Sequence, residues 1–312
     1  MRVTSSVPHQ PAPISLLCYL SRRFTYLSEE QWHERIREGR ILINDCCVTD
    51  ASMNLFRGDI VAYDMPNFDE PPADLSYQVI YEDEWILGVA KSGNCLVHKS
   101  GKSFRSNLIY QLRYCHAPTP YPGINAVHRL DRETSGVVIF AKEKDVSIRL
   151  NTAFLRREIR KEYLAIVKGI PSRHSWTALL PIGKDETPGD RCKFRIDTEN
   201  GKPAQTHFEI AKALNFECTL LRAHPVTGRT HQIRVHLAAS GLNLIGDKVY
   251  AAITGNRVAG EIPCKEFRGI DCFPRQALHC ASIGFDHPVT KEAITIEAPF
   301  PADMKTLLQT LQ

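Results

Sequence analysis

The sequence lacks a long apolar run, a nucleotide-binding motif and the apolar segment of a secretory signal. No stretch reaches about 18 apolar residues, the length that a helix needs to cross a bilayer. Neither G-x-x-x-x-G-K-S/T nor G-x-G-x-x-G occurs, which removes the motif evidence for a nucleotide cofactor. The first residues, 1–13, contain no apolar core of a signal peptide. These absences predict a cytoplasmic protein that does not enter a membrane.

The ten cysteines lack the spacing of a metal site or of a redox motif. None forms a C-x-x-C pair, and the series Cys264, Cys272 and Cys280 has spacings that zinc sites do not use. In a cytosolic chain of this length, reduced cysteines are the expected state. We therefore predict packing roles for the cysteines, and no bound metal.

The net charge of +4 is divided unevenly along the chain. Residues 1–70 hold seven Lys or Arg and ten Asp or Glu, whereas residues 71–312 hold 32 and 25. The first part therefore carries −3 and the second part +7. If a polyanion binds this protein, we expect its main contacts on the second part.

Composition predicts two domains joined by a linker. Three prolines and little apolar content predict a mobile tail over residues 1–13. Residues 14–64 have the pattern of two helices followed by short strands. A segment rich in proline and acidic residues predicts a linker over 65–78. The remaining residues, 79–312, form the second domain.

The second domain is rich in strand patterns and has few helical ones. Runs of β-branched and aromatic residues predict strands at 78–81, 85–90, 136–141, 163–167, 206–211, 216–221 and 293–296. Helical patterns cover only 103–113, 144–158 and 231–240. Sparse helices among many strands favour an α+β fold with a mixed, largely antiparallel central sheet.

A dense polar segment, His128-Arg-Leu-Asp131-Arg-Glu-Thr-Ser-Gly136, stands directly before an apolar strand pattern. Asp131 lies between two arginines, and nearby positive charge keeps a carboxylate ionised. A loop that enters a buried strand can hold such a group rigidly, as a catalytic site requires. From spacing alone, a surface cluster of salt bridges is the favoured explanation of the segment.

A second polar segment runs from Thr227 to Leu237. Its histidines, His231 and His236, are five residues apart, which is poor helical spacing for a shared metal ion. Gly228-Arg229-Thr230 at the start of a helix would instead present backbone N–H groups to an anion. The segment therefore favours a phosphate or RNA contact over a metal site.

At these two segments the sequence resembles the RluA-type pseudouridine synthases. The segment 128–136 is similar to their signature loop, in which the related RsuA-type enzymes usually have Gly at the position of His128. Other blocks resemble the family in the expected order, at 79–98, 161–169, 228–250 and 276–280. Residues 14–64, with Gly39-Arg-Ile-Leu-Ile-Asn44, resemble a small S4-like α/β RNA-binding domain.

The resemblance implies the pseudouridine synthase fold and the isomerisation of specific uridines in structured RNA. Ribosomal RNA is favoured over tRNA because an S4-like domain precedes the catalytic domain. The reaction needs no redox change or energy input, so no cofactor is expected. We expect the enzyme to act as a monomer.

The resemblance also implies roles for individual residues. Asp131 matches the catalytic carboxylate, which acts either as a nucleophile or as a base at C2′. Arg234 matches the arginine that pairs with this aspartate, in a geometry expected to be bidentate. Tyr163 matches the tyrosine that stacks on the target base and can assist proton removal from C5, and Leu278 matches the apolar wall of the pocket. Arg129 matches the position associated with flipping the uridine out of its stack.

Further basic residues are expected to contact RNA. They are His128 and Arg132 in the signature loop, Arg229 in the second segment, and the run Arg156-Arg-Glu-Ile-Arg160-Lys161, which carries a net charge of +3. Such contacts add affinity that depends on salt but carry no sequence information. A solvated helix face is the alternative explanation for the run.

Two other functional classes remain open from the sequence. The first is an RNA-binding protein that keeps the fold without catalysis, which the loss of Asp131, Tyr163 or Arg234 would favour. All three are present. The second is a metal-dependent hydrolase that uses histidine and cysteine, which the spacing of these residues disfavours.

Overall fold

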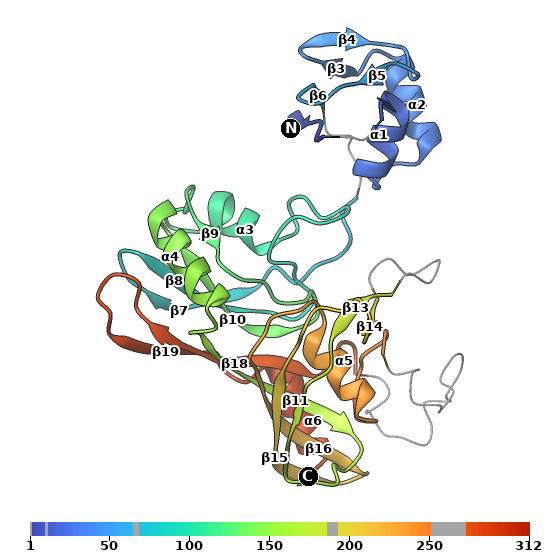
Figure 1. Ribbon diagram of the computed structural model, residues 1–312. Helices are drawn as coiled ribbons and strands as arrows, with labels where there is room; N and C mark the ends of the chain where they lie inside the picture. The colour runs from blue at the N-terminus through green and yellow to red at the C-terminus, as the bar shows by residue number, and fades with distance from the viewer. Residues whose placement is uncertain (1, 10–11, 65–68, 186–192, 251–272) are drawn as a thin grey trace. The chain divides into compact units, whose positions relative to one another are not determined.

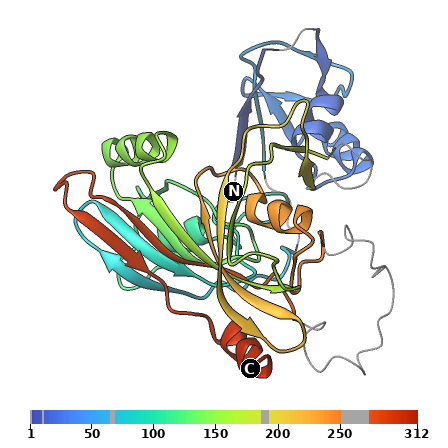
Figure 2. The ribbon, with the colours of Figure 1, turned by 60° about the horizontal axis from the view of Figure 1, so that its bottom comes forward.

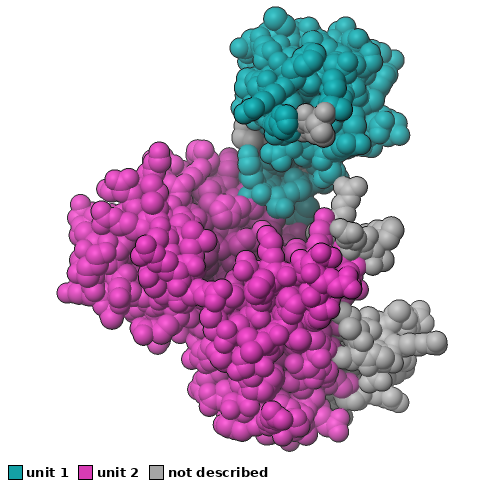
Figure 3. Space-filling model, viewed as in Figure 1, with its two compact units in different colours: residues 1–71, 99–104 teal, residues 72–98, 105–312 magenta. Residues whose placement is uncertain are grey.

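The computed structural model describes residues 2–9, 12–64, 69–185, 193–250 and 273–312 (Figure 1). The chain divides into two compact units (Figure 3). Unit 1 comprises residues 1–71 and 99–104, and unit 2 comprises residues 72–98 and 105–312. Within the described ranges, no helix is long and apolar enough to cross a membrane.

Unit 1 contains two helices and an antiparallel sheet with the strand order β1-β6-β3-β4. A separate pair, β2 and β5, joins the start of α1 to a later turn. The elements are β1 (Arg2–Ser6), β2 (Ile14–Ser15), α1 (Leu16–Arg23), α2 (Glu29–Arg37), β3 (Ile41–Ile43), β4 (Cys46–Val48), β5 (Asn54–Leu55) and β6 (Ile60–Asp64).

Local sequence signals explain the boundaries of these elements. Ser28 and Gln31 form a complete capping box at the start of α2, with backbone-to-side-chain distances of 2.9 and 3.3 Å. Asn44 and Asp45 both have positive φ, at 50° and 64°, which a tight hairpin between β3 and β4 requires. Trp32 of α2 is fully buried in the core of the unit.

The N-terminal strand corrects one expectation. Residues 2–6 pair with β6 in antiparallel register, from Arg2 opposite Asp64 to Ser6 opposite Ile60. The prediction of a mobile tail is therefore wrong for this segment, because a distant strand supplies the hydrogen bonds that the local sequence does not indicate. Residues 65–68 of the predicted linker lie outside the described residues, and its last two positions already belong to β7.

Unit 2 is built on one large sheet with the strand order β12-β15-β16-β11-β18-β10-β8-β7. The short strands β9, β17 and β19 pair with its members, and β13 with β14 forms a separate ribbon. The strands are β7 (Tyr77–Glu82), β8 (Ile86–Lys91), β9 (Asn125–Ala126), β10 (Ser135–Ala141), β11 (Arg160–Lys168), β12 (Ser175–Ala178), β13 (Ile182–Lys184), β14 (Phe194–Ile196), β15 (Thr206–Leu214), β16 (Cys218–Pro225), β17 (Asn243–Leu244), β18 (Leu278–Asp286) and β19 (Ala293–Glu297).

The helices of unit 2 are few, as the sequence predicts. They are α3 (Leu108–Tyr110), the π-helical turn η1 (Gln111–Cys115), α4 (Lys144–Leu155), α5 (Gln232–Ala239) and α6 (Ala302–Thr310). Figures 1 and 2 show α4 against β10, and α5 beside β14 and β16. Among the described strands only β10 and β18 pair in parallel, so the predicted α+β fold with a mixed, largely antiparallel sheet is confirmed.

The centre of the sheet differs from the sequence prediction at one strand. β18 lies between β10 and β11, yet its sequence, Leu-His-Cys-Ala-Ser-Ile-Gly-Phe-Asp, has no clear alternation. The strand is mostly buried, and it packs between two neighbours rather than against solvent. Burial by tertiary neighbours therefore overrides its weak local signal for a strand.

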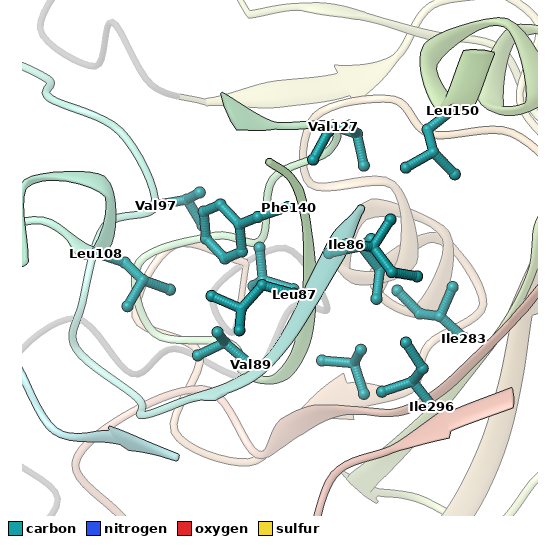
Figure 4. Packing of buried hydrophobic residues seen from close by; sticks show 14 of the residues in the cluster. Ile86, Leu87, Val89, Val97, Leu108, Val127, Phe140, Leu150, Ile283 and Ile296 are labelled. Carbon is teal, nitrogen blue, oxygen red and sulfur yellow. The ribbon is translucent and has the colours of Figure 1, made fainter. Parts of the chain in front are cut away.

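Apolar side chains from the two faces of β8 and β10 form the main core of unit 2. All seven residues of β10 are buried, and a strand covered on both faces is apolar without interruption. Figure 4 shows Ile86, Leu87 and Val89 of β8 beside Phe140 of β10, with Ile283 of β18 nearby. This core fixes the strand from which the signature loop projects.

The strand register brings the two polar segments together. Gly136 of β10 is opposite Cys280 of β18, which is in turn opposite Tyr163 of β11. Gly136 has a φ of +118°, and a Cβ there would lie 2.1 Å from the Cys280 carbonyl oxygen. Only glycine allows this approach, so Gly136 sets the distance between the signature loop and Tyr163.

We predict that Gly136→Ala lowers the free energy of unfolding by at least about 2 kcal/mol, because the new methyl collides with the β18 backbone. Gly241→Ala is the matched control, since Gly241 also has positive φ but faces open space. It should cost about 1 kcal/mol through backbone strain alone. Thermal unfolding measures both variants, and equal losses would contradict the steric explanation.

Candidate active site

A cleft of about 510 Å³ opens in unit 2. The loop before β10, the start of β11, the loop after β16 and the start of α5 form its lining. Eight of the nine residues predicted for the site line this cleft: His128, Arg129, Asp131, Lys161, Tyr163, Arg229, Arg234 and Leu278. The fold therefore brings these eight side chains together from four separate segments of the sequence.

Hydrogen bonds to backbone carbonyls hold the loop that carries Asp131. The ammonium of Lys91, only 2% exposed, donates to the carbonyls of Ser92, Cys95 and Arg132 at 2.7, 2.8 and 3.1 Å. The Cys95 N–H also donates to the Arg132 carbonyl, at 3.0 Å. Burial lowers the pKa of Lys91 to about 7. The carbonyl following Asp131 is thus fixed by two donors.

A second buried cation supports the same loop from the C-terminal side. The Arg275 guanidinium donates to the Glu133 carbonyl at 3.0 Å and pairs with both carboxylate oxygens of Asp303, at 2.6 and 2.9 Å. Gly93 leaves room for it, since a Cβ there would lie 2.4 Å from the Arg275 Cδ. Arg275 therefore connects the signature loop with α6.

Arg234 has a different principal partner from the predicted one. Its Nε and one terminal nitrogen bind the two carboxylate oxygens of Asp247, at 2.7 and 2.8 Å. The other terminal nitrogen, Nη1, lies 3.2 Å from Oδ2 of Asp131. The expectation of a bidentate pair with Asp131 is therefore wrong. Asp247 accepts both hydrogen bonds of the bidentate pair, and Asp131 accepts a single hydrogen bond from the guanidinium.

His231 and Tyr250 also lie close to Asp131 and Arg234. The His231 Nε2 is 3.8 Å from Oδ2 of Asp131, and its Nδ1 is 2.8 Å from the Tyr250 hydroxyl. The Tyr250 ring also stacks on the Arg234 guanidinium, with 4.9 Å between Cζ and the ring centre. Burial lowers the pKa of His231, although Asp131 opposes this effect. The imidazole is therefore neutral.

Tyr163 and Leu278 provide apolar surface in the cleft. The strand β11 has a register shift between Glu162 and Tyr163, and such a bulge re-aims a side chain. Burial raises the pKa of Tyr163 well above its ordinary value, with the Cys280 thiol as a hydrogen-bonding neighbour. Tyr163 is therefore a neutral phenol, which suits stacking on a planar ring better than removing a proton.

The residues predicted to contact RNA differ in their exposure and in their hydrogen bonds within the protein. Arg129 is exposed at the cleft and has no hydrogen bond or ion pair with any described residue. Arg157 and Lys161 from the basic run also line the cleft, and burial lowers the pKa of Lys161. In contrast, His128 accepts the N–H of Ile139 at 3.0 Å, and burial lowers its pKa to about 3. His128 is therefore neutral and supports β10.

The structure gives partners to two residues of the polar segments. Arg132 does not line the cleft, because its guanidinium donates to the Asn94 side chain and the Pro72 carbonyl, at 2.9 and 2.5 Å. The helix α5 begins at Gln232. The side-chain oxygen of Gln232 accepts a hydrogen bond from the backbone N–H of Arg229 at 3.0 Å. This backbone donor is therefore occupied within the protein rather than open to an anion.

Four residues that the sequence analysis did not single out support Asp131 or its loop without lining the cleft. Asp247 and Tyr250 belong to the block 228–250, which resembles the family but by itself assigns no role to these two residues. Lys91 and Arg275 are buried cations, and the sequence offers no sign of their burial. Burial is a property of the fold, so the sequence could not have indicated Lys91 and Arg275. Only the spacing of Asp247 and Tyr250 within their block could have indicated a role for those two residues.

The chemistry of the lining is that of a site for a nucleotide in a polyanion. Asp131 is the single carboxylate among the described lining residues, and the cations are Arg129, Arg157, Lys161, Arg229 and Arg234. Excess positive charge suits phosphates, and Tyr163 with Leu278 offers faces for a planar base. An ionised carboxylate at the same place can attack or deprotonate a sugar carbon.

Comparisons with known proteins agree with this chemistry. Residues 87–239 match the family model described as RNA pseudouridylate synthase. The chain is 32% identical to the uncharacterized RNA pseudouridine synthase YlyB of Bacillus subtilis, over 91% of this chain and 88% of the relative. It is also 32% identical to ribosomal large subunit pseudouridine synthase D of Vibrio cholerae, over 93% and 88%.

A solved structure is also similar. Human RNA pseudouridylate synthase domain containing 1 superimposes with a TM-score of 0.57 and 27% identity. The similarity covers 74% of this chain and 86% of the human chain.

We predict that Asp247→Asn lowers the free energy of unfolding by about 3 kcal/mol, because it leaves the buried Arg234 guanidinium without its charged partner. Urea denaturation measures the loss. Asp286→Asn, at the exposed end of β18, is the control and should change stability by less than about 0.5 kcal/mol. A loss for Asp247→Asn as small as that of the control would refute the structural role of this pair.

Proposed function

The chain belongs to the RluA-type family of RNA pseudouridine synthases, and on this premise we propose that it isomerises specific uridines in the RNA of the large ribosomal subunit. The relative from V. cholerae carries this substrate in its name. The observation that supports the reaction at this cleft is the position of Asp131, 3.2 Å from the buried Arg234 guanidinium. An arginine at this distance favours the ionised form of a carboxylate.

The reaction converts a C1′–N1 bond into a C1′–C5 bond. The C1′–N1 electron pair leaves with the uracil, the ring turns, and C5 bonds to C1′. C5 then loses its proton and N1 gains one, so atoms and electrons balance without a cofactor. Asp131 takes part either by bonding to C1′ or by removing the proton from C2′. Both routes need an ionised carboxylate at the sugar.

The neighbours of Asp131 hold it in position for this step. Arg234 is itself fixed by Asp247, so its third nitrogen meets Asp131 at a defined angle. Lys91 and Arg275 fix the loop carbonyls on either side. Preorganised donors of this kind stabilise charge without reorganising during the reaction.

The cations at the cleft hold the RNA backbone while the target base enters. Arg129 is free to occupy the space that the uridine leaves, and Arg157 with Lys161 is placed for phosphates. Flipping a uridine out of a folded RNA costs a few kcal/mol. Stacking on Tyr163 and contact with Leu278 offset part of this cost.

We further propose that residues 14–64 bind RNA in the manner of an S4-like domain, and that the enzyme acts as a cytoplasmic monomer. The net charge of −3 over residues 1–70 is consistent with an accessory role in RNA binding. The larger positive charge belongs to the part of the chain with the cleft.

We predict that Asp131→Asn abolishes pseudouridine formation, with a loss of at least about 10³-fold in rate, because an amide can neither attack the sugar nor accept its proton. Large-subunit ribosomal RNA and tRNA transcripts serve as substrates, and pseudouridines are mapped by sequencing and mass spectrometry. Asp286→Asn is the control and should retain wild-type activity. Unchanged modification by Asp131→Asn would reject the catalytic assignment, and modification of tRNA alone would reject the proposed substrate.

We predict that the double variant Arg157→Gln, Lys161→Met binds RNA more weakly and with a shallower salt dependence, because two phosphate contacts are lost. The slope of log K against log salt should fall by about 1.5 to 2. Lys305→Gln, on the exposed face of α6, should leave the slope unchanged. A slope for the double variant equal to that of the wild type would assign the basic run to a solvated surface.

A further inference from the structure

His231 presents an unpaired donor to the cleft beside Asp131. The imidazole lines the cleft, and its Nδ1 is hydrogen-bonded to the Tyr250 hydroxyl at 2.8 Å. Its Nε2 lies 3.8 Å from Oδ2 of Asp131, which is longer than a hydrogen bond. No other described residue forms a hydrogen bond with this ring. The Nε2 side is therefore available to a substrate.

The surroundings determine which ring nitrogen carries the hydrogen. The N–H of Phe194 donates to the Tyr250 oxygen at 3.0 Å, so the phenolic hydrogen is free to point at His231. With the Tyr250 hydroxyl as the donor to Nδ1, the hydrogen of the neutral imidazole is on Nε2. The series of hydrogen bonds from Phe194 through Tyr250 to His231 thus ends in an N–H group that faces the cleft.

The backbone at His231 is unusual as well. His231 directly precedes α5 and has a φ of +57°, in the left-handed region that side chains other than Asn, Asp and Gly rarely adopt. The Phe194 and Tyr250 rings both meet the imidazole edge-on, with ring centres 5.6 and 5.7 Å away. Strain of this kind persists where the surrounding structure fixes a functional group.

We propose that His231 is a catalytic residue that donates a hydrogen bond from Nε2 to the uracil O2 as the glycosidic bond breaks. This inference rests on the proposed function, because Asp131 must act at the ribose. The atom C1′ is bonded to N1, and the neighbouring ring carbon bears O2, so a donor 3.8 Å from the Asp131 oxygen lies within reach of O2.

The hydrogen bond assists whichever route Asp131 takes. When the C1′–N1 bond breaks, its electron pair passes to the uracil ring and increases the negative charge on O2. Asp131 meanwhile bonds to C1′ or takes the C2′ proton. His231 transfers no proton and returns unchanged. A neutral donor serves this purpose without attracting the Asp131 carboxylate into an ion pair.

The first test compares uridine with 5-fluorouridine at the target position of the same RNA. Fluorine makes the ring a better leaving group, so the departing base needs less help from a hydrogen bond. The variant His231→Asn removes the donor but keeps a residue that tolerates positive φ. Single-turnover measurements follow the consumption of the target nucleotide by nuclease digestion and mass spectrometry, at saturating enzyme.

We expect His231→Asn to slow the uridine reaction by about 100-fold and the 5-fluorouridine reaction by less than about 10-fold, with RNA affinity unchanged. Tyr250→Phe keeps the ring over Arg234 but removes the hydroxyl, so it should show the same asymmetry with smaller losses. His174→Gln, an exposed histidine outside the cleft, should match the wild type with both substrates.

The outcomes separate this inference from the proposed function. Equal losses for uridine and 5-fluorouridine would show that His231 acts only by positioning Asp131, and would overturn the hydrogen bond to the base. Wild-type rates for His231→Asn would overturn it as well. A wild-type enzyme that modifies no RNA at all would instead refute the proposed function.

Discussion

The buried guanidinium of Arg234 is the interaction on which the site depends. It binds Asp247 through two nitrogens and Asp131 through the third, while its face lies against the Tyr250 ring. A buried charge of this kind is costly unless every donor has a partner. The structure satisfies this requirement with one aspartate that anchors the arginine and one that remains accessible in the cleft. This arrangement orients the Asp131 carboxylate through one hydrogen bond from Arg234.

The same logic extends to the loop behind Asp131. A loop rich in polar groups enters a sheet whose strand β10 is entirely buried, so its carbonyls need donors. Lys91 and Arg275, both nearly inaccessible to solvent, supply these donors from β8 and from the segment before β18. Catalytic groups on a rigid edge lose little entropy when substrate binds, which favours an exact geometry for the reaction.

Individual elements show how far sequence patterns reach. The capping box at Ser28, the hairpin turn at Asn44 and the buried strand β10 were all predictable, because their causes are local. Strand β1 and strand β18 were not, since each depends on a partner far along the chain. Within the site, the motif indicated Arg234 but not the identity of its bidentate partner, and Arg132, which it also named, is not among the residues that line the cleft.

The sequence by itself determined the family and the fold class, and it indicated the candidate site residues, because motifs preserve residue types at short spacing. Only the tertiary structure decided how these residues are paired. Asp131 and Arg234 are 103 residues apart, and strand register together with burial brings them within hydrogen-bonding distance. The ionisation of Lys91, His128 and Tyr163 was decided in the same way, since removal from water is a consequence of packing and has no local sequence signature.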